Sequence, residues 1–200
     1  MIFGPSISRL RALLKLSDSV DIAKRYFVMN AFDGALTALG IILGAWLAGV
    51  TDPKTIILAG LGASIAMGVS GCFGAYLTES AMKKEQLAEY ADVMLESFDN
   101  TVFDEAAKWD SFFVAAVDGL SPFLASAISI SPFIIYESFS PGGWDIDQVY
   151  LSAVVLTAII LFLLGAFLGR ISKESIPRNG LKMLTAGIVT GVLVLFLEFL

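Results

Sequence analysis

Five long apolar stretches constrain the fold of this chain more than any other feature of its sequence. Each one is about as long as the roughly 20 residues that an α-helix needs to cross the hydrocarbon core of a bilayer. Hydrophobic residues make up 56% of the 200 residues, charged residues only 16%, and the mean hydropathy is +0.79. The sequence therefore predicts an all-α, polytopic membrane protein with five transmembrane helices, at residues 26–49, 55–78, 111–136, 149–170 and 181–200.

The polar segments between these stretches divide the chain into four parts, although one domain is expected. The N-terminal part lacks the continuous apolar run of a secretory signal. Its leucines and basic residues instead follow a helical spacing, which predicts an amphipathic helix at the lipid interface. The four parts are the interfacial helix 1–25, the first two spans 26–78, an acidic, amphipathic helical insert 79–110, and the last three spans 111–200.

The basic residues predict the orientation. Twelve of the thirteen Lys and Arg residues lie in the N-terminal segment, in the insert or around the 171–180 connection, and only Lys54 lies on the other side. Loops rich in basic residues stay in the cytoplasm. We therefore expect a cytoplasmic N-terminus and insert and a C-terminus on the far side of the membrane. The net charge of −6 gives no reason to expect nucleic-acid binding.

The first two spans resemble the third and fourth. The segment FVMNAFDGALTA, from residue 27, aligns with FFVAAVDGLSPF, from residue 112, so that Asp118 falls on Asp33 and Gly119 on Gly34. Both halves are expected to start on the same side of the membrane. The pattern predicts a parallel internal repeat, related by an axis along the membrane normal, with no counterpart for the fifth span.

Asp33 is the most unusual residue of the first span. Inserting an aspartate at the centre of a bilayer costs about 2.5–3.5 kcal/mol on insertion scales. Such a residue is therefore expected to have a function that offsets this free energy. Polar and small residues recur with it at spacings of three and four, which places them on one helical face. Such a face is expected to meet protein or a water-filled path; its members are Asn30, Asp33, Thr37, Gly40 and Gly44.

Two further spans carry candidate site residues. Asp118 in the third span precedes Pro122 and Pro132, each of which frees a backbone carbonyl that needs protein or a cavity beside it. The second span has a small-residue face for close helix packing, on which Met67 is the large member. Its thioether is a ligand that suits softer metals, although packing alone explains most membrane methionines. Either aspartate could also serve only as a hydrogen-bonding partner of neighbouring helices.

The insert carries an unbroken acidic stripe. Five carboxylates recur at spacings of 4, 3, 4 and 3, and no basic residue stands between the first and the last. A solvated helix face usually intersperses lysine, because like charges at these spacings repel. Carboxylates are ligands for divalent cations. We therefore predict metal attraction by Glu85, Glu89, Asp92, Glu96 and Asp99, and by Glu79 at the mouth of the second span.

The sequence excludes several kinds of chemistry. It contains no histidine and a single cysteine, Cys72. Histidine-based metal sites, Ser-His and Cys-His catalysis and an intrachain disulfide framework are therefore all excluded.

At these residues the chain resembles the vacuolar iron transporter family. The resemblance runs from about residue 24 onward and rests on FDGALTALG, on Gly71, Gly74 and Tyr76, on the acidic insert and on the five spans. It makes the chain a short-insert member, with Ala75 where the family commonly has an acidic residue. The resemblance implies homodimers that move Fe²⁺, and sometimes Mn²⁺, out of the cytosol in exchange for protons. It places the path at the dimer interface, beside the aspartate that Asp33 matches and a methionine that Met67 replaces.

The resulting hypothesis is a transporter without catalytic residues or a permanently bound cofactor, with the divalent metal as its substrate. Asp33, Asn30, Thr37, Met67 and Asp118 are expected to form the membrane site of a multi-pass protein in the cell membrane, or in a vacuolar-type membrane in a eukaryote. Two alternatives remain at this point. One is an intramembrane aspartyl protease that uses Asp33 and Asp118, although the glycine follows each aspartate here, and the other is a membrane scaffold without transport.

Overall fold

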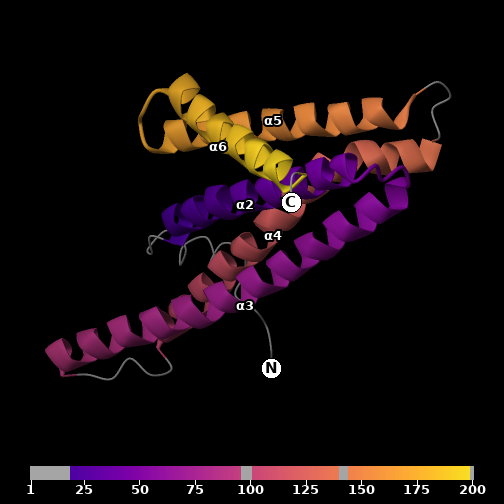
Figure 1. Cartoon of the computed structure of the whole chain (residues 1–200). Coiled ribbons are helices and arrows are strands. Elements are labelled where there is room, and N and C mark those ends of the chain that lie inside the picture. The colour runs from indigo at the N-terminus through magenta and orange to yellow at the C-terminus, as the bar shows by residue number, and fades with distance from the viewer. Residues whose placement is uncertain (1–18, 96–100, 140–143, 199–200) are drawn as a thin grey trace. The chain divides into compact units, whose positions relative to one another are not determined.

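The computed structural model describes residues 19–95, 101–139 and 144–198. The described residues form helices and no strand (Figure 1). All five helices are long and apolar enough to cross a membrane, which confirms the predicted fold class. The helices are α2 (Ser19–Leu47), α3 (Pro53–Met94), α4 (Val102–Phe139), α5 (Ile146–Ile171) and α6 (Ile176–Leu197).

The predicted interfacial helix lies mostly in residues 1–18, outside the described residues. The described part of that segment, from Ser19, already belongs to α2. The helix α3 has 42 residues, and at 1.5 Å per residue it is about 63 Å long, whereas the hydrocarbon core is about 30 Å thick. About half of α3 therefore extends beyond the membrane. It carries the first part of the acidic insert as a direct continuation of the second span.

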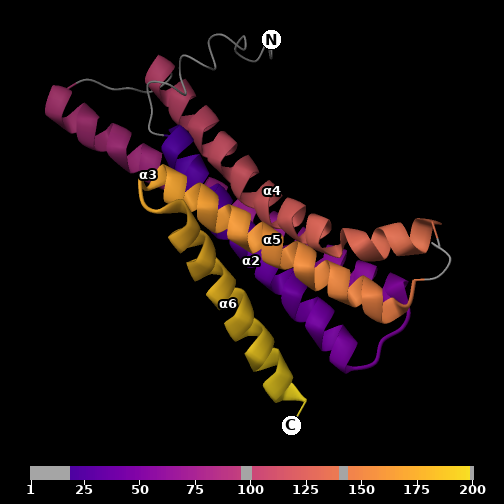
Figure 2. The ribbon, with the colours of Figure 1, turned by 90° about the horizontal axis from the view of Figure 1, so that it is seen from above.

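The chain divides into two compact units, and α2, α3 and α4 contribute to both. The first unit comprises Met1–Phe27 and Val69–Leu120, and the second comprises Val28–Gly68 and Ser121–Leu200. Within the second unit, α6 turns back alongside α5 (Figures 1 and 2). Figure 2 also shows α4 bending toward its C-terminal end, and this helix contains two prolines, Pro122 and Pro132, of the residue type that most often kinks helices.

The core of the second unit lies around Tyr150 of α5. Its ring stacks on Trp46 at 5.3 Å between centroids and meets Phe133 edge-on at 5.0 Å. Its hydroxyl donates a hydrogen bond of 2.7 Å to the backbone carbonyl of Val50, and the indole N–H of Trp46 donates one of 2.9 Å to Asp147. Buried aromatic side chains that satisfy their polar groups in this way anchor three helices and the α2–α3 loop at one end of the unit.

Local sequence signals set the helix ends of the α2–α3 connection. Gly49 adopts a positive φ of 68°, and the N–H groups of Gly49 and Val50 bond to the carbonyls of Trp46 and Ala45, both at 3.0 Å. This is a Schellman cap, which glycine adopts without steric cost. Pro53 then opens α3 at a position where a missing N–H does no harm.

Gly34 allows α2 and α4 to pack closely in the second unit. It is buried, and a Cβ built on it would lie 2.5 Å from the Cα of Pro122 in α4. The backbones of α2 and α4 therefore approach each other here as only glycine allows. Pro122 thus lies against protein, which is one of the two surroundings expected for it.

We expect Gly34→Ala to lower the midpoint of thermal unfolding of the detergent-solubilised protein. The added methyl group would meet backbone atoms, which cannot move aside as a side chain can, and overpacking of this kind costs about 1–3 kcal/mol. Gly62→Ala in α3 is the matched control, because a Cβ there also meets nothing within 4 Å. In that variant alanine adds up to about 1 kcal/mol of helix propensity. Equal midpoints for the two variants would contradict the close approach.

Asp52 caps the N-terminus of α3. Its carboxylate accepts hydrogen bonds from the Thr55 hydroxyl at 2.7 Å and from the backbone N–H groups of Thr55 and Lys54 at 3.2 and 3.3 Å. These bonds, first of all the one from the Thr55 hydroxyl, lower the pKa of the Asp52 carboxyl from its usual value. The cap therefore stabilises the folded state fully above the unfolded pKa of about 3.9, and its contribution disappears as the pH falls through the lower folded pKa.

Asp52→Asn tests this cap. Asparagine caps helices about as well as aspartate but does not titrate in this range. We expect the difference in melting temperature between the two proteins to stay constant above about pH 5 and to change only below about pH 4. A difference that varies between neutral pH and pH 5 would show that another group is responsible.

Candidate functional site

The helix α2 has one face buried in its own chain and one open face. Ala35, Ala38 and Ile42 are fully buried on the first. On the second, Asp33 is exposed, and a Cβ built on Gly40 or Gly44 would meet nothing within 4 Å. Around Asp33, Gly40 and Gly44 the predicted polar stripe is therefore not covered by the described residues of the same chain, even though it lies within a candidate membrane span.

The structure brings two of the predicted site residues together. The Thr37 hydroxyl of α2 donates a hydrogen bond to the Met67 sulfur of α3 at 3.5 Å. Both side chains are half-buried, as is Asn30, which lies one turn before Asp33 on α2. A carboxylate, a hydroxyl and a thioether thus lie on or beside one helical stripe of the second unit. These are donor types that bind a divalent cation of intermediate softness.

The small-residue face of α3 packs against α4, as its composition predicts. In the second unit Ser64 is fully buried, and its hydroxyl bonds to Ser126 at 2.6 Å and to the Gly60 carbonyl. Gly60 itself lies against the Ile130 side chain. The face is not closed along its whole length, since a Cβ on Gly74 would meet nothing within 4 Å. This packing holds the α3 segment that carries Met67.

The first unit buries three carboxylates. Asp118 of α4 is 5% exposed, and a Cβ on Gly71 of α3 would lie 2.7 Å from its Oδ2. Glu79 of α3 is 6% exposed, and its Oε1 accepts a hydrogen bond of 3.2 Å from the Tyr26 hydroxyl of α2. Glu79 is therefore not a solvated residue at a helix end but part of a buried contact between α2 and α3.

The third buried carboxylate is Asp110, which sequence reasoning missed. It is 2% exposed, and its Oδ2 lies 3.7 Å from Nζ of Lys83. Its Oδ1 is buried and has no hydrogen-bond partner among the described residues. Lys83 follows Glu79 by four residues and Asp110 precedes Asp118 by eight, but this spacing does not by itself indicate that Asp110 is buried.

Three members of the acidic stripe lie on the outer surface of α3. Glu85, Glu89 and Asp92 are exposed, whereas Leu87 and Ala91 on the opposite face are half-buried. The opposite face is only partly covered, since Met94 there is 66% exposed, and the amphipathic packing of the insert stays a prediction. Glu96 and Asp99 lie outside the described residues.

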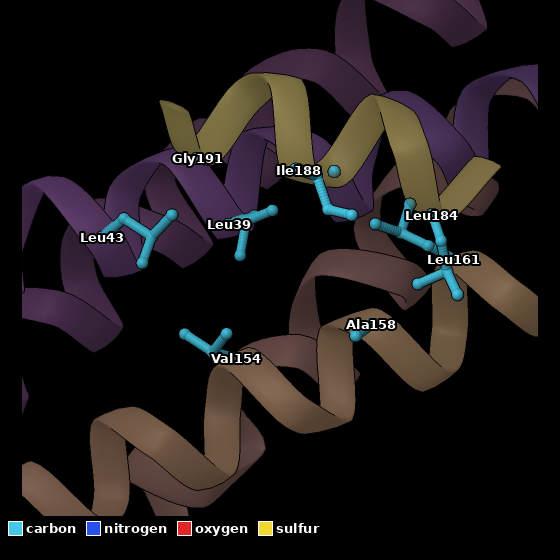
Figure 3. A pocket seen from close by; sticks show the side chains of 9 residues that line it. Leu39, Leu43, Val154, Ala158, Leu161, Leu184, Ile188 and Gly191 are labelled. Atoms are coloured by element: carbon cyan, nitrogen blue, oxygen red, sulfur yellow. The ribbon is translucent and has the colours of Figure 1, made fainter. Parts of the chain in front are cut away.

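No three Asp, Glu, Cys or His side chains of the described residues come close enough to hold a metal ion. An ion bound beside Asp33 would therefore complete its shell with other donors. The apolar pocket of about 210 Å³ between α2, α5 and α6 is no alternative (Figure 3), because aliphatic side chains and glycine line it, among them Leu39, Leu43, Val154 and Leu161. Cation sites need oxygen, nitrogen or sulfur donors.

Comparison with known proteins agrees with these features. The model of the VIT family matches residues 24–108, a range that includes Asp33, Met67 and the described part of the acidic stripe. A protein of Methanocaldococcus jannaschii, named Uncharacterized protein MJ0645, is 32% identical over 177 residues, which cover 87% of each chain. No solved structure matches.

The matched range contains FDGALTALG, Gly71, Gly74, Tyr76 and nearly all of the acidic insert, which are features that the resemblance rested on. The chain belongs to the VIT family of membrane metal-ion transporters.

Proposed function

We propose that this protein exports Fe²⁺, with Mn²⁺ as a second substrate, from the cytoplasm in exchange for protons. The observation that carries the proposal is the open face of α2, where Asp33 is exposed within a membrane span. A carboxylate that faced lipid there would cost about 2.5–3.5 kcal/mol. Burial in the same chain does not remove this cost, so that something else must cover the stripe.

A second copy of the chain is the proposed cover. In a two-fold symmetric dimer the same face of each protomer meets itself. Gly40 and Gly44 have open space beside them in the single chain, which leaves room for close approach of a second α2. Two Asp33 carboxylates would then face one path, and each protomer would add its Thr37 and Met67. The dimer would supply the donors that the described residues of one chain lack.

Exchange for protons follows from competition for a carboxylate. In an apolar environment a carboxyl group favours its neutral, protonated form, whereas a dication favours the ionised form. Entry of the metal ion would release the proton, and reprotonation from the far side would release the metal ion. The exposed carboxylates on α3 would raise the local concentration of cations near the entrance.

The two alternatives have no observation in their favour. A protease would leave the exposed acidic helix without a role, and the glycine follows both aspartates rather than preceding them. A scaffold would have no use for an exposed carboxylate in a membrane span. The transporter accounts for both features.

We expect Asp33→Ala to abolish Fe²⁺ uptake driven by a pH gradient in proteoliposomes, because the group that exchanges metal for proton is gone. Asp21→Ala is the matched control, since Asp21 is an exposed carboxylate on the same helix and pairs only with Lys24 at 2.7 Å in the described structure. Normal transport by Asp33→Ala would refute the assignment of the site.

A second test concerns the acidic stripe. The triple variant Glu85→Gln, Glu89→Gln, Asp92→Asn should raise KM for the cation and leave kcat unchanged, because it weakens capture and not the transfer step. The difference should shrink as ionic strength rises, since the Debye length falls from about 10 Å at 0.1 M to about 3 Å at 1 M salt. An unchanged KM at low salt would show that the stripe is only a solvated surface.

A further inference from the structure

The ion pair between Lys83 and Asp110 is unusual because it is buried and incomplete. It joins α3 and α4 within the first unit, and the Asp110 side chain is 3% exposed. The distance of 3.7 Å exceeds the roughly 2.7–2.9 Å of a hydrogen bond between an ammonium and a carboxylate. Nearby on α4, the more exposed pair of Lys108 and Asp104 closes to 2.8 Å.

Asp110 thus offers binding capacity that the described residues do not use. An ionised carboxylate has about four lone-pair positions. One oxygen of Asp110 has no hydrogen-bond partner among the described residues, and the other has an ammonium beyond bonding distance. A buried carboxylate without hydrogen bonds or a close counter-ion is destabilising, because nothing compensates for its lost hydration. A bound cation would compensate for it.

We propose that Asp110 is a transit site for the divalent cation, and that the ammonium of Lys83 is a tethered counter-ion that fills the site when no metal is bound. Lys83 is suited to this exchange because its side chain is long and flexible and is 20% exposed. Its ammonium can move into water while the aliphatic part of the side chain stays between α3 and α4. The carboxylate is then paired in both states, with lysine or with metal.

Glu79 is a second buried carboxylate of the first unit. It lies one turn before Lys83 on the same face of α3, and the Tyr26 hydroxyl holds one of its oxygens. The donors are therefore oxygens, which favour Mn²⁺, Fe²⁺ and Mg²⁺. Because no three acidic side chains of the described residues converge, the ion keeps several waters. Such a site binds weakly and releases its ion quickly, as transit requires.

This inference deepens the proposed function, since it takes the transported cation as the ligand, but binding can be measured without transport. The purified full chain in detergent is titrated with Mn²⁺, and free Mn²⁺ is followed by electron paramagnetic resonance. The background carries Gln or Asn in place of Glu85, Glu89, Asp92, Glu96 and Asp99, so that the stripe does not mask the site. Lys83→Met is compared with Lys84→Met, which removes an exposed lysine next to it.

We expect Lys83→Met to tighten Mn²⁺ binding by about tenfold or more, because a competing charge beside the carboxylate is removed. Lys84→Met should leave the affinity unchanged, and adding Asp110→Asn to Lys83→Met should abolish the gain. Equal affinities for the two lysine variants would overturn the proposal, as would tight binding that survives Asp110→Asn.

Stability provides a second readout, since Lys83→Met leaves a buried charge uncompensated until metal binds. We expect its melting temperature to rise on addition of Mn²⁺ by more than that of Lys84→Met. A Lys83→Met protein that is unfolded and that Mn²⁺ does not restore would overturn the proposal. Transport assays separate the two claims: intact Mn²⁺ binding together with no transport by the wild type would refute the proposed function and not this site.

Discussion

The energetic cost of a carboxylate away from water governs the arrangement of this protein. The first unit buries Glu79, Asp110 and Asp118, and each of the first two lies beside a polar side chain of another helix. Glu79 accepts a hydrogen bond from Tyr26, and Asp110 lies beside the ammonium of Lys83. Both partners come from a neighbouring helix, so that the polar contacts also hold the helices of the unit together. Removing one partner of such a pair is more destructive than replacing both, because it strands a buried charge.

In the second unit the intramembrane carboxylate is exposed on the chain and not buried. Asp33 stays exposed on the chain, while the next residue, Gly34, packs against the backbone of α4 at Pro122. Adjacent residues of a helix point about 100° apart. Gly34 can therefore face α4 while Asp33 lies on the exposed face of α2. The glycine fixes where α2 crosses α4, and this crossing turns the aspartate outward. The rigid backbone contact thus sets the direction of the side chain that we propose to be functional.

Much of the candidate site could be predicted from the sequence because helical periodicity is local. The stripe through Asn30, Asp33 and Thr37 follows from spacing and from the rarity of polar groups in apolar runs, whereas the contact of Thr37 with Met67 is seen only in the tertiary structure. Asp110 and Lys83 could not be predicted in the same way. Each lies in a polar segment where charged residues are ordinary, and only the pairing of α3 with α4 shows that Asp110 is buried and that Lys83 lies beside it.

By itself the sequence determined the five membrane helices, the exposed acidic face of α3 and the polar stripe of α2. These depend on apolar length and on a period of 3.6 residues, which no tertiary contact alters. The internal repeat and the orientation in the membrane remain predictions from the sequence. Only the tertiary structure decided which carboxylates are buried, which face of α2 is left open and why a glycine stands at position 34. These depend on how close two helices approach, and that distance is set by packing between residues far apart in the chain.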